Sequence, residues 1–290
     1  SLKKPLYENE NIIDGKDIYS SSEPYPDKWY DYRFGCGLEK GERVIIFNLL
    51  CYPVRYIPNE DIIQTLEDIE IKITYEECET TELSQRKSDL VIIAPLRFHL
   101  SLLPLKWHKQ SMNISTSIKS VESIYLTTSG RDKQEKIKKF IKSAIDEWDT
   151  KYVLLVGGRN NNRFRFHLPV RYTNLEDRGG WNETYVTDLY YADVYRINPT
   201  TFQREFEDWD SNNNDIFAEW TWEWNSEWNW WSNQVKSKDV LDLYPDVYIG
   251  RLACLNNYEV RVVVNKIINY EKNINSGSPW FKRMIVAGGD

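Results

Sequence analysis

The stretch GRDKQEKIKKFIKSAIDEWDTKYVLLVGG, residues 130–158, encodes a helix followed by a buried strand. Lysine and glutamate residues fill one face of the helical part, and the other face is apolar, as in an amphipathic helix. The apolar residues at this spacing are Ile137, Ile141, Ala144, Ile145 and Trp148. The run 152–156 is then apolar throughout and is ended by two glycines, which is typical of a strand that is buried on both faces. The stretch therefore predicts a helix that leads into an interior strand.

The same alternation occurs on both sides of this stretch. SDLVIIAP (88–95) predicts a buried strand closed by a proline, 102–112 has helical spacing, and 114–125 predicts a strand and a turn. DVYIGRLAC (246–254), a helix over 257–274 and the strand FKRMIVAGG (281–289) repeat the unit. Strands that alternate with helices predict an α/β fold with a mostly parallel sheet flanked by helices.

Residues 1–88 have a different pattern. RVIIFNLLCYPVRYIP (43–58) and IEIKITYEEC (69–78) alternate apolar and polar residues, which predicts half-buried antiparallel strands. We therefore expect two domains, a small β-rich domain over 1–88 and an α/β domain over 89–290.

Composition excludes two classes of protein. The 37 basic and 44 acidic residues give a net charge of −7 without a basic block, which argues against nucleic-acid binding. The longest apolar runs are too short to cross a bilayer, so we expect no transmembrane segment. Four cysteines show no metal-type spacing, and the high aromatic content fits an extracellular or cell-surface protein. The chain does not begin with Met, so we expect that the original amino terminus was removed.

Six motifs occur in the order seen in gingipain-type cysteine peptidases. They are SDLVIIAP, the 130–158 stretch, TDLYYADVY (187–195), DLYPDVYIGRLAC (242–254), VVNKIINYEK (263–272) and FKRMIVAGGD (281–290). Residues 88–290 thus resemble this family, and 1–88 resemble its β-rich pro-segment more weakly. Asn113 and Asn265 depart from the family pattern, which has Gly and Asp there. The resemblance implies a caspase-like fold, secretion, and protein or peptide substrates.

The resemblance assigns no catalytic residue to this chain. In gingipain-type peptidases the catalytic His and Cys, and the acidic residue that selects a basic side chain, follow the strand that MIVAGGD resembles. The resemblance therefore implies a C-terminal catalytic segment or chain as partner. We also expect 281–287 to be an interior strand whose free edge requires that partner.

A dyad within the chain itself is disfavoured. Cys254 is the only thiol near the end of a predicted strand, and the histidines are His99, His108 and His167. A core thiol and surface histidines are the simpler interpretation.

DWDSNNNDIFAEW (208–220) is the best-supported candidate site. Acidic and amide residues recur at every second position, and calcium takes six to eight oxygen ligands from such flexible loops. An ordinary Asn-rich turn is the alternative. The predicted calcium ligands are Asp208, Asp210, Asn212, Asn214, Ile216 through its carbonyl, and Glu219.

Three further motifs have both a functional and a structural interpretation. The tryptophans of 219–231 could bind a ligand or pack against the calcium loop. The glycine-containing segment 156–166 lacks the Lys-Ser/Thr of a phosphate loop, which argues against phosphate binding there. Carboxylates after the strands could line a cleft, bind a second ion or pair with Arg251. They are Asp188, Asp193, Asp242 and Asp246.

Two functions follow from this sequence. The first is part of a secreted gingipain-like cysteine endopeptidase whose Cys–His dyad lies beyond residue 290. The alternative is a non-catalytic, calcium-stabilised cell-surface or assembly protein that uses the same fold.

Overall fold

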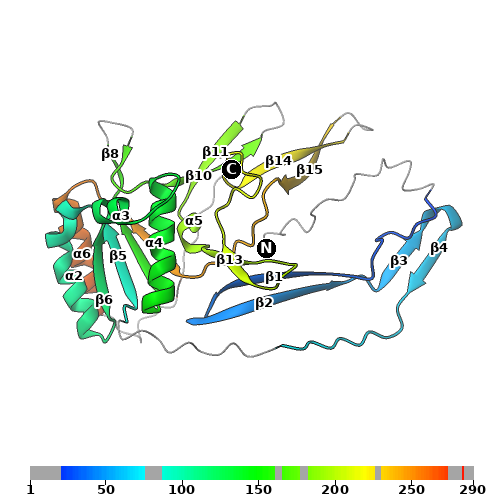
Figure 1. The fold of residues 1–290 in the computed structure, drawn as a ribbon, viewed down its shortest axis with the longest axis horizontal. Helices are drawn as coiled ribbons and strands as arrows, with labels where there is room; N and C mark the ends of the chain where they lie inside the picture. The colour runs from blue at the N-terminus through cyan, green and yellow to red at the C-terminus, as the bar shows by residue number, and fades with distance from the viewer. Residues whose placement is uncertain are drawn as a thin grey trace.

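A four-stranded parallel sheet forms the centre of the α/β part (Figure 1). The computed structural model describes residues 21–75, 87–160, 165–176, 182–225, 230–273 and 283. The strand order is β16-β7-β5-β6, and all neighbours are parallel. The strands are β5 (Leu90–Ala94), β6 (Thr116–Ser120), β7 (Tyr152–Val156) and β16 (Tyr248–Leu252). The predicted α/β architecture is confirmed.

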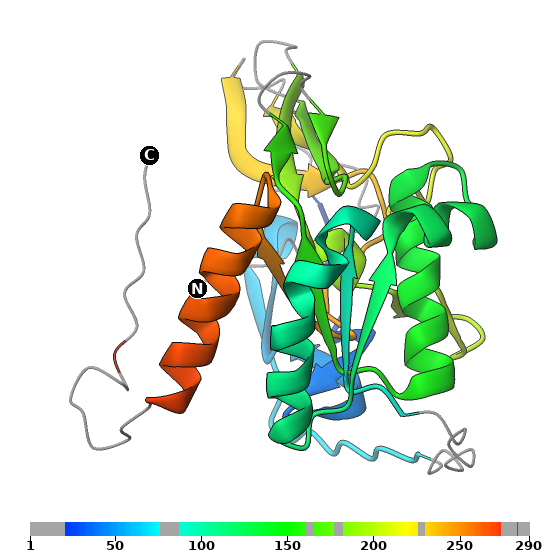
Figure 2. The ribbon, with the colours of Figure 1, turned by 90° about the vertical axis from the view of Figure 1, so that its left-hand side faces the viewer.

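Helices cover both faces of this sheet, so the region has three layers (Figure 2). Helices α2 (His99–Ser111), preceded by the turn η2 (Leu96–Phe98), and α6 (Asn257–Lys272) pack on one face. Helices α3 (Val121–Thr127) and α4 (Lys133–Trp148) pack on the other. All five residues of β5 are buried, because alternate side chains enter the two different cores. This explains why the strand is apolar throughout.

Polar side chains set where the long helices begin. The Asp132 carboxylate accepts the Glu135 N–H at 2.8 Å, and the Glu135 carboxylate accepts the Arg131 N–H at 3.0 Å. The first contact satisfies an N–H group that the first turn leaves without a helical partner, and the second satisfies the N–H of the residue before the N-cap. Asn256 and Glu259 cap α6 in the same way.

The segment 114–125 differs partly from its prediction. The strand is present as β6, but the residues that follow form helix α3 and not a turn. The Ser120 hydroxyl accepts the Ser123 N–H at 3.1 Å, which caps this helix. The helix is too short for its spacing to be distinguished from a turn in the sequence.

An insertion between β7 and β16 forms a second, mixed sheet with the order β11-β10-β14-β15 (Figure 1). Its strands are β10 (Arg171–Glu176), β11 (Asn182–Thr187), β14 (Glu219–Asn225) and β15 (Trp230–Ser237). The short helix α5 and two small hairpins complete the insertion. These are α5 (Leu189–Ala192), β8 (Arg159–Asn160) with β9 (Arg165–Phe166), and β12 (Tyr195–Ile197) with β13 (Arg204–Phe206).

The N-terminal part consists of antiparallel pairs, as its sequence pattern predicts. Strands β1 (Tyr30–Glu39) and β2 (Glu42–Cys51) form one hairpin, and β3 (Val54–Ile57) pairs with β4 (Ile62–Thr65) across the turn η1 (Pro58–Glu60). The first hairpin packs against the α/β part, where the Leu38 N–H donates to the Pro245 carbonyl at 2.8 Å. The boundary at residue 88 stays a prediction.

The predicted strand over 69–78 is wrong for its described residues, 69–75. This segment is extended but pairs with no strand in the described structure, and its apolar side chains are exposed at Ile69, Ile71, Ile73 and Tyr75. Alternation makes a segment suitable for a sheet, but a strand also needs a neighbour for its backbone hydrogen bonds. The predicted strand over 281–287 lies outside the described residues.

The three-layer arrangement predicts that adjacent β5 residues stabilise two separate cores. Ile92→Ala and Ile93→Ala should each lower the free energy of unfolding by about 2–5 kcal/mol, because both side chains are fully buried. Urea unfolding of each variant measures this cost. Ile45→Ala, at a residue that is 66% exposed on β2, is the control and should change stability by less than about 0.5 kcal/mol. A similarly small effect at Ile92 or Ile93 would contradict the arrangement.

Candidate functional site

The carboxyl ends of β7 and β16 are joined by Arg251. Its guanidinium donates two hydrogen bonds of 2.7 Å to the Asp188 carboxylate and others to the carbonyls of Gly157, Leu168 and Pro169 at 2.9–3.1 Å. This confirms the structural interpretation of Asp188, which lies before α5. A guanidinium whose donors are directed to fixed acceptors holds the edge of the sheet together and is not free to bind a ligand.

The two glycines after β7 allow the backbones of β7 and β16 to come close together. A side chain at Gly158 would place its Cβ 2.4 Å from the Ala253 carbonyl oxygen, and Gly157 has φ +147°. The Gly157 and Gly158 N–H groups donate to the carbonyls of Leu252 and Cys254, each at 2.9 Å. These glycines therefore serve close packing at an edge where α/β proteins commonly bind ligands.

This edge holds no activated nucleophile among the described residues. Cys254 is buried, and burial, with the nearby Glu259, raises the pKa of its thiol. In the part of the chain that the structure describes, no hydrogen bond links a cysteine to an imidazole. A nucleophilic thiol needs such a base or a lowered pKa. Cys254 is therefore a core thiol, as the sequence favoured.

The three histidines lie apart. His108 contacts Glu271 at 2.8 Å between α2 and α6, and His99 lies at the start of α2. His167 lies at the carboxyl edge, where the Arg97 guanidinium contacts its ring at 2.8 Å. Burial and Arg97 lower the pKa of His167, so the ring stays neutral at physiological pH.

The predicted calcium loop surrounds an arginine from another part of the chain. Arg131, just before α4, contacts Asp210 at 2.6 Å and Asp208 at 3.1 Å. The Asp210 side chain is fully buried and also accepts the backbone N–H groups of Asn214 and Asp215. A guanidinium therefore occupies the position that the sequence analysis gave to a cation.

The side chains of the other predicted ligands, Asn212, Asn214 and Glu219, already have partners. The side-chain oxygen of Asn212 accepts the Asn214 N–H, that of Asn214 accepts the Ile216 N–H, and Glu219 pairs with Lys238 at 2.7 Å. These are the contacts of an Asn-rich turn. Within the described residues no group of three or more His, Cys, Asp or Glu side chains is arranged to hold a metal ion. The described geometry does not form a calcium site by itself, and calcium binding stays a prediction.

Arg131 holds this loop and was not among the residues predicted from the sequence. Its side chain also contacts Glu135 at 2.8 Å. Burial alone would raise the pKa of Glu135, but hydrogen bonds from Lys139 and Arg131 outweigh it and lower this pKa to about 2. The only sequence signal was an arginine directly before the helix cap.

The carboxylates of Asp193, Asp242 and Asp246 do not line an open cleft. All three are buried, as are Glu207 and Lys138 of α4. Helical periodicity predicts that the α4 lysines are exposed, but Lys138 has no exposed surface and lies 4.2 Å from the centre of the Tyr190 ring.

The tryptophan-rich segment forms the β14–β15 pair of the second sheet, in which Trp220 and Trp222 are half-buried. The side chains of 223–234, and those of Arg159, Arg163 and Arg165, lie outside the described residues.

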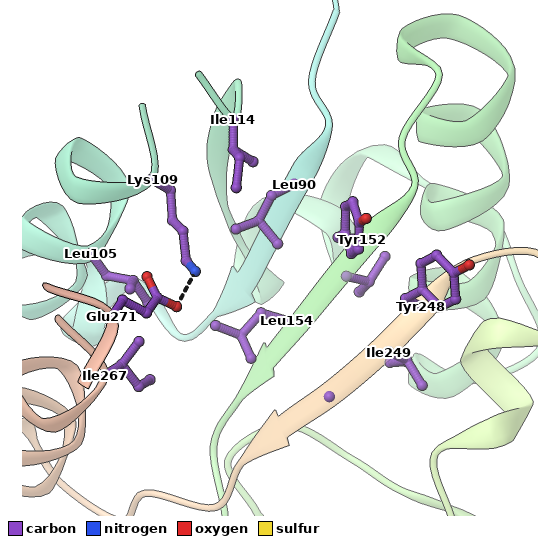
Figure 3. A pocket seen from close by; sticks show the side chains of 12 residues that line it. Leu90, Leu105, Lys109, Ile114, Tyr152, Leu154, Tyr248, Ile249, Ile267 and Glu271 are labelled. Carbon is purple, nitrogen blue, oxygen red and sulfur yellow. Dashed lines mark hydrogen bonds and ion pairs between the residues drawn. The ribbon is translucent and has the colours of Figure 1, made fainter. Parts of the chain in front are cut away.

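An apolar groove of about 580 Å³ lies at the opposite end of the parallel sheet (Figure 3). It is lined at the amino ends of the strands by Leu90, Tyr152 and Tyr248, and the Lys109–Glu271 pair lies at its rim. Its place at the amino ends separates it from the carboxyl edge.

No helix in the described part of the chain is long and apolar enough to cross a membrane.

Comparison with known proteins gives a match to one family. A search of curated proteins finds no match. Among solved structures, dimeric latent PorU from Porphyromonas gingivalis is similar at 16% identity with a TM-score of 0.42. The similarity covers 65% of this chain and 16% of the PorU chain. The model of peptidase family C25 matches residues 83–290, which include the parallel sheet, its helices and the insertion. The chain therefore belongs to peptidase family C25, the gingipain family.

Proposed function

We propose that this chain is the N-terminal portion of a secreted, gingipain-like cysteine endopeptidase whose catalytic dyad lies beyond residue 290. The match to peptidase family C25 over 83–290 carries the proposal. The carboxyl edge supports it, because Arg251 and Asp188 make a fixed structural pair there and Cys254 lacks an imidazole partner among the described residues. The chemistry is therefore assigned to a C-terminal catalytic segment or chain.

In this proposal the chain positions that segment and supplies no reacting group. A cysteine thiolate of the segment attacks the scissile carbonyl, a histidine takes and returns the proton, and backbone N–H groups hold the oxyanion. The substrates are proteins or peptides, and the enzyme acts outside the cell or on its surface.

The alternative is a non-catalytic, calcium-stabilised cell-surface or assembly protein that uses the same fold. Fold and family do not by themselves establish catalysis. The two functions differ in whether a His and a Cys follow residue 290.

Residues 1–290 alone should not hydrolyse a quenched fluorescent casein, whereas the natural chain extended through the next His and Cys should hydrolyse it with sensitivity to a thiol reagent. Fluorescence release measures both, and Cys254→Ala should leave both results unchanged. Turnover by 1–290 that is lost in Cys254→Ala would overturn the assignment. A natural chain without a later dyad would establish the non-catalytic alternative.

We further propose that calcium stabilises the 208–219 loop. The alternating oxygen donors of its sequence support this, although in the described geometry Arg131 holds Asp208 and Asp210. Calcium binding would require Arg131 to move aside, because both carboxylates already serve the guanidinium.

Thermal unfolding distinguishes stabilisation of the loop by calcium from stabilisation by Arg131. At a hundredfold excess over its Kd, calcium should add about 2.7 kcal/mol to the free energy of unfolding, and Asp208→Asn should remove most of this gain. Equal melting temperatures with calcium and with chelator would show that the loop is held by Arg131 alone.

Arg131→Ala should lower stability in chelator by about 2–3 kcal/mol, because the buried Asp210 loses its charged donor. The control Lys142→Ala removes an exposed ion pair with Asp146 on the same helix and should cost less than about 0.5 kcal/mol. An equal loss of stability in the two variants would show that Arg131 does not hold the 208–219 loop.

A further inference from the structure

The segment that follows β4 is extended and lies at the surface of the molecule. Figure 1 shows residues 69–75, IEIKITY, within the cyan trace that runs along the outside of the chain without a strand beside it. Among the described residues, no backbone hydrogen bond joins 69–75 to another segment. The backbone of this segment is therefore available for pairing with a strand of another molecule.

The side chains of 69–75 have the alternation of a strand with one apolar face. Four large apolar side chains alternate with polar ones and are 48–79% exposed, at Ile69, Ile71, Ile73 and Tyr75. β-Branched and aromatic residues favour strands, and the segment contains neither proline nor glycine. Isolated exposed apolar residues are ordinary, but four at alternate positions form an apolar face of the kind that binds a partner.

The two charged residues of this segment complement each other when it pairs with a second copy of itself. In an antiparallel pair with a two-fold axis at Ile71, Glu70 of each copy lies opposite Lys72 of the other. On the other face Ile69 lies opposite Ile73, and Ile71 lies opposite its own copy. Each charge is thereby paired with its opposite, and each isoleucine with an isoleucine.

Other registers lack this complementarity. An axis at residue 70 or 72 places Glu70 opposite Glu70 or Lys72 opposite Lys72, and a parallel in-register pair places each charge opposite its own copy. A register shift of one residue places the isoleucines opposite polar side chains. Like charges that lie directly opposite each other are destabilising, so the sequence favours the antiparallel register centred on Ile71.

We propose that residues 69–75 are a self-association surface, through which two copies of this chain pair as antiparallel strands about a two-fold axis at Ile71. The pairing supplies backbone hydrogen bonds that the segment does not make within the described structure, and it brings the isoleucine side chains of the two copies into contact. Two short strands form a small interface, so the association is weak and depends on concentration. It is independent of the proposed function, since it uses no residue of the carboxyl edge and requires no catalysis.

Charge reversal tests the pairing of Glu70 with Lys72. In sedimentation velocity of residues 1–290 over a concentration series, Glu70→Lys and Lys72→Glu should each raise the dimer Kd by about tenfold, because each places like charges opposite each other at two positions. An equimolar mixture of the two variants should recover the Kd of the unaltered chain, since the mixed pair restores both opposite-charge contacts. Both residues are exposed, so neither change should affect folding. Lys28→Glu, at an exposed residue before β1, is the matched control and should leave the Kd unchanged.

A disulfide tests the register. Ile71→Cys places two thiols opposite each other at the axis, where paired Cα atoms lie about 4.5–5.5 Å apart, within disulfide range. Ile73→Cys is the control on the same face, because its two copies lie four residues apart along the strands, or about 13 Å. Mild oxidation should link the first variant into a dimer and not the second, as measured by non-reducing gel electrophoresis. Both variants keep the four native cysteines and so share the same background.

A chain that stays monomeric up to about 1 mM would overturn the proposal. Charge reversals without effect, or a mixture that does not regain the association, would overturn it as well. Equal cross-linking of the two cysteine variants would have the same consequence, because it would exclude the register centred on Ile71.

Discussion

The pairing of Arg251 with Asp188 is the interaction on which the arrangement of the α/β part depends. Arg251 lies in β16, Asp188 precedes α5, and the three carbonyls that also accept from Arg251 belong to the exit of β7 and to 168–169. One guanidinium therefore holds the insertion against the parallel sheet. Its planar array of donors suits this task, because a lysine could not reach five acceptor atoms in fixed directions.

Buried charge is the second constraint on this fold. Arg171 is 5% exposed, contacts Asp132 at 2.7 Å and lies 3.6 Å from the centre of the Phe217 ring. Such a pair is stabilising only where each charge keeps a partner, since an unpaired buried ion is costly. Asp193, Glu207 and Asp246 are buried close to Lys138, and burial raises the pKa of each of these carboxyl groups.

The carboxyl edge of the parallel sheet is held rigidly. The Arg251–Asp188 ion pair and the close backbone contacts at Gly157 and Gly158 fix the ends of β7 and β16 against each other. The hairpin before residue 83 contacts the α/β part at the other end of these strands, through Asp242 and Asp246, which precede β16.

The sequence by itself determined the α/β class, because periodicity and burial are local properties. The run 90–94 had to be buried on both faces, and the spacing from Ile137 to Ile145 required an amphipathic helix. The motifs from 88 to 290 also determined the family.

The structure alone decided how charges distant in the chain come together. Arg131 meets Asp210 across 79 residues, and Lys138 of a helix that looks solvent-facing is enclosed by aromatic rings. Periodicity does not predict such long-range contacts, because a charged side chain is buried only when a partner from another element covers it. The alternation of 69–75 likewise did not specify a strand, since the neighbour that completes a strand lies elsewhere in the fold.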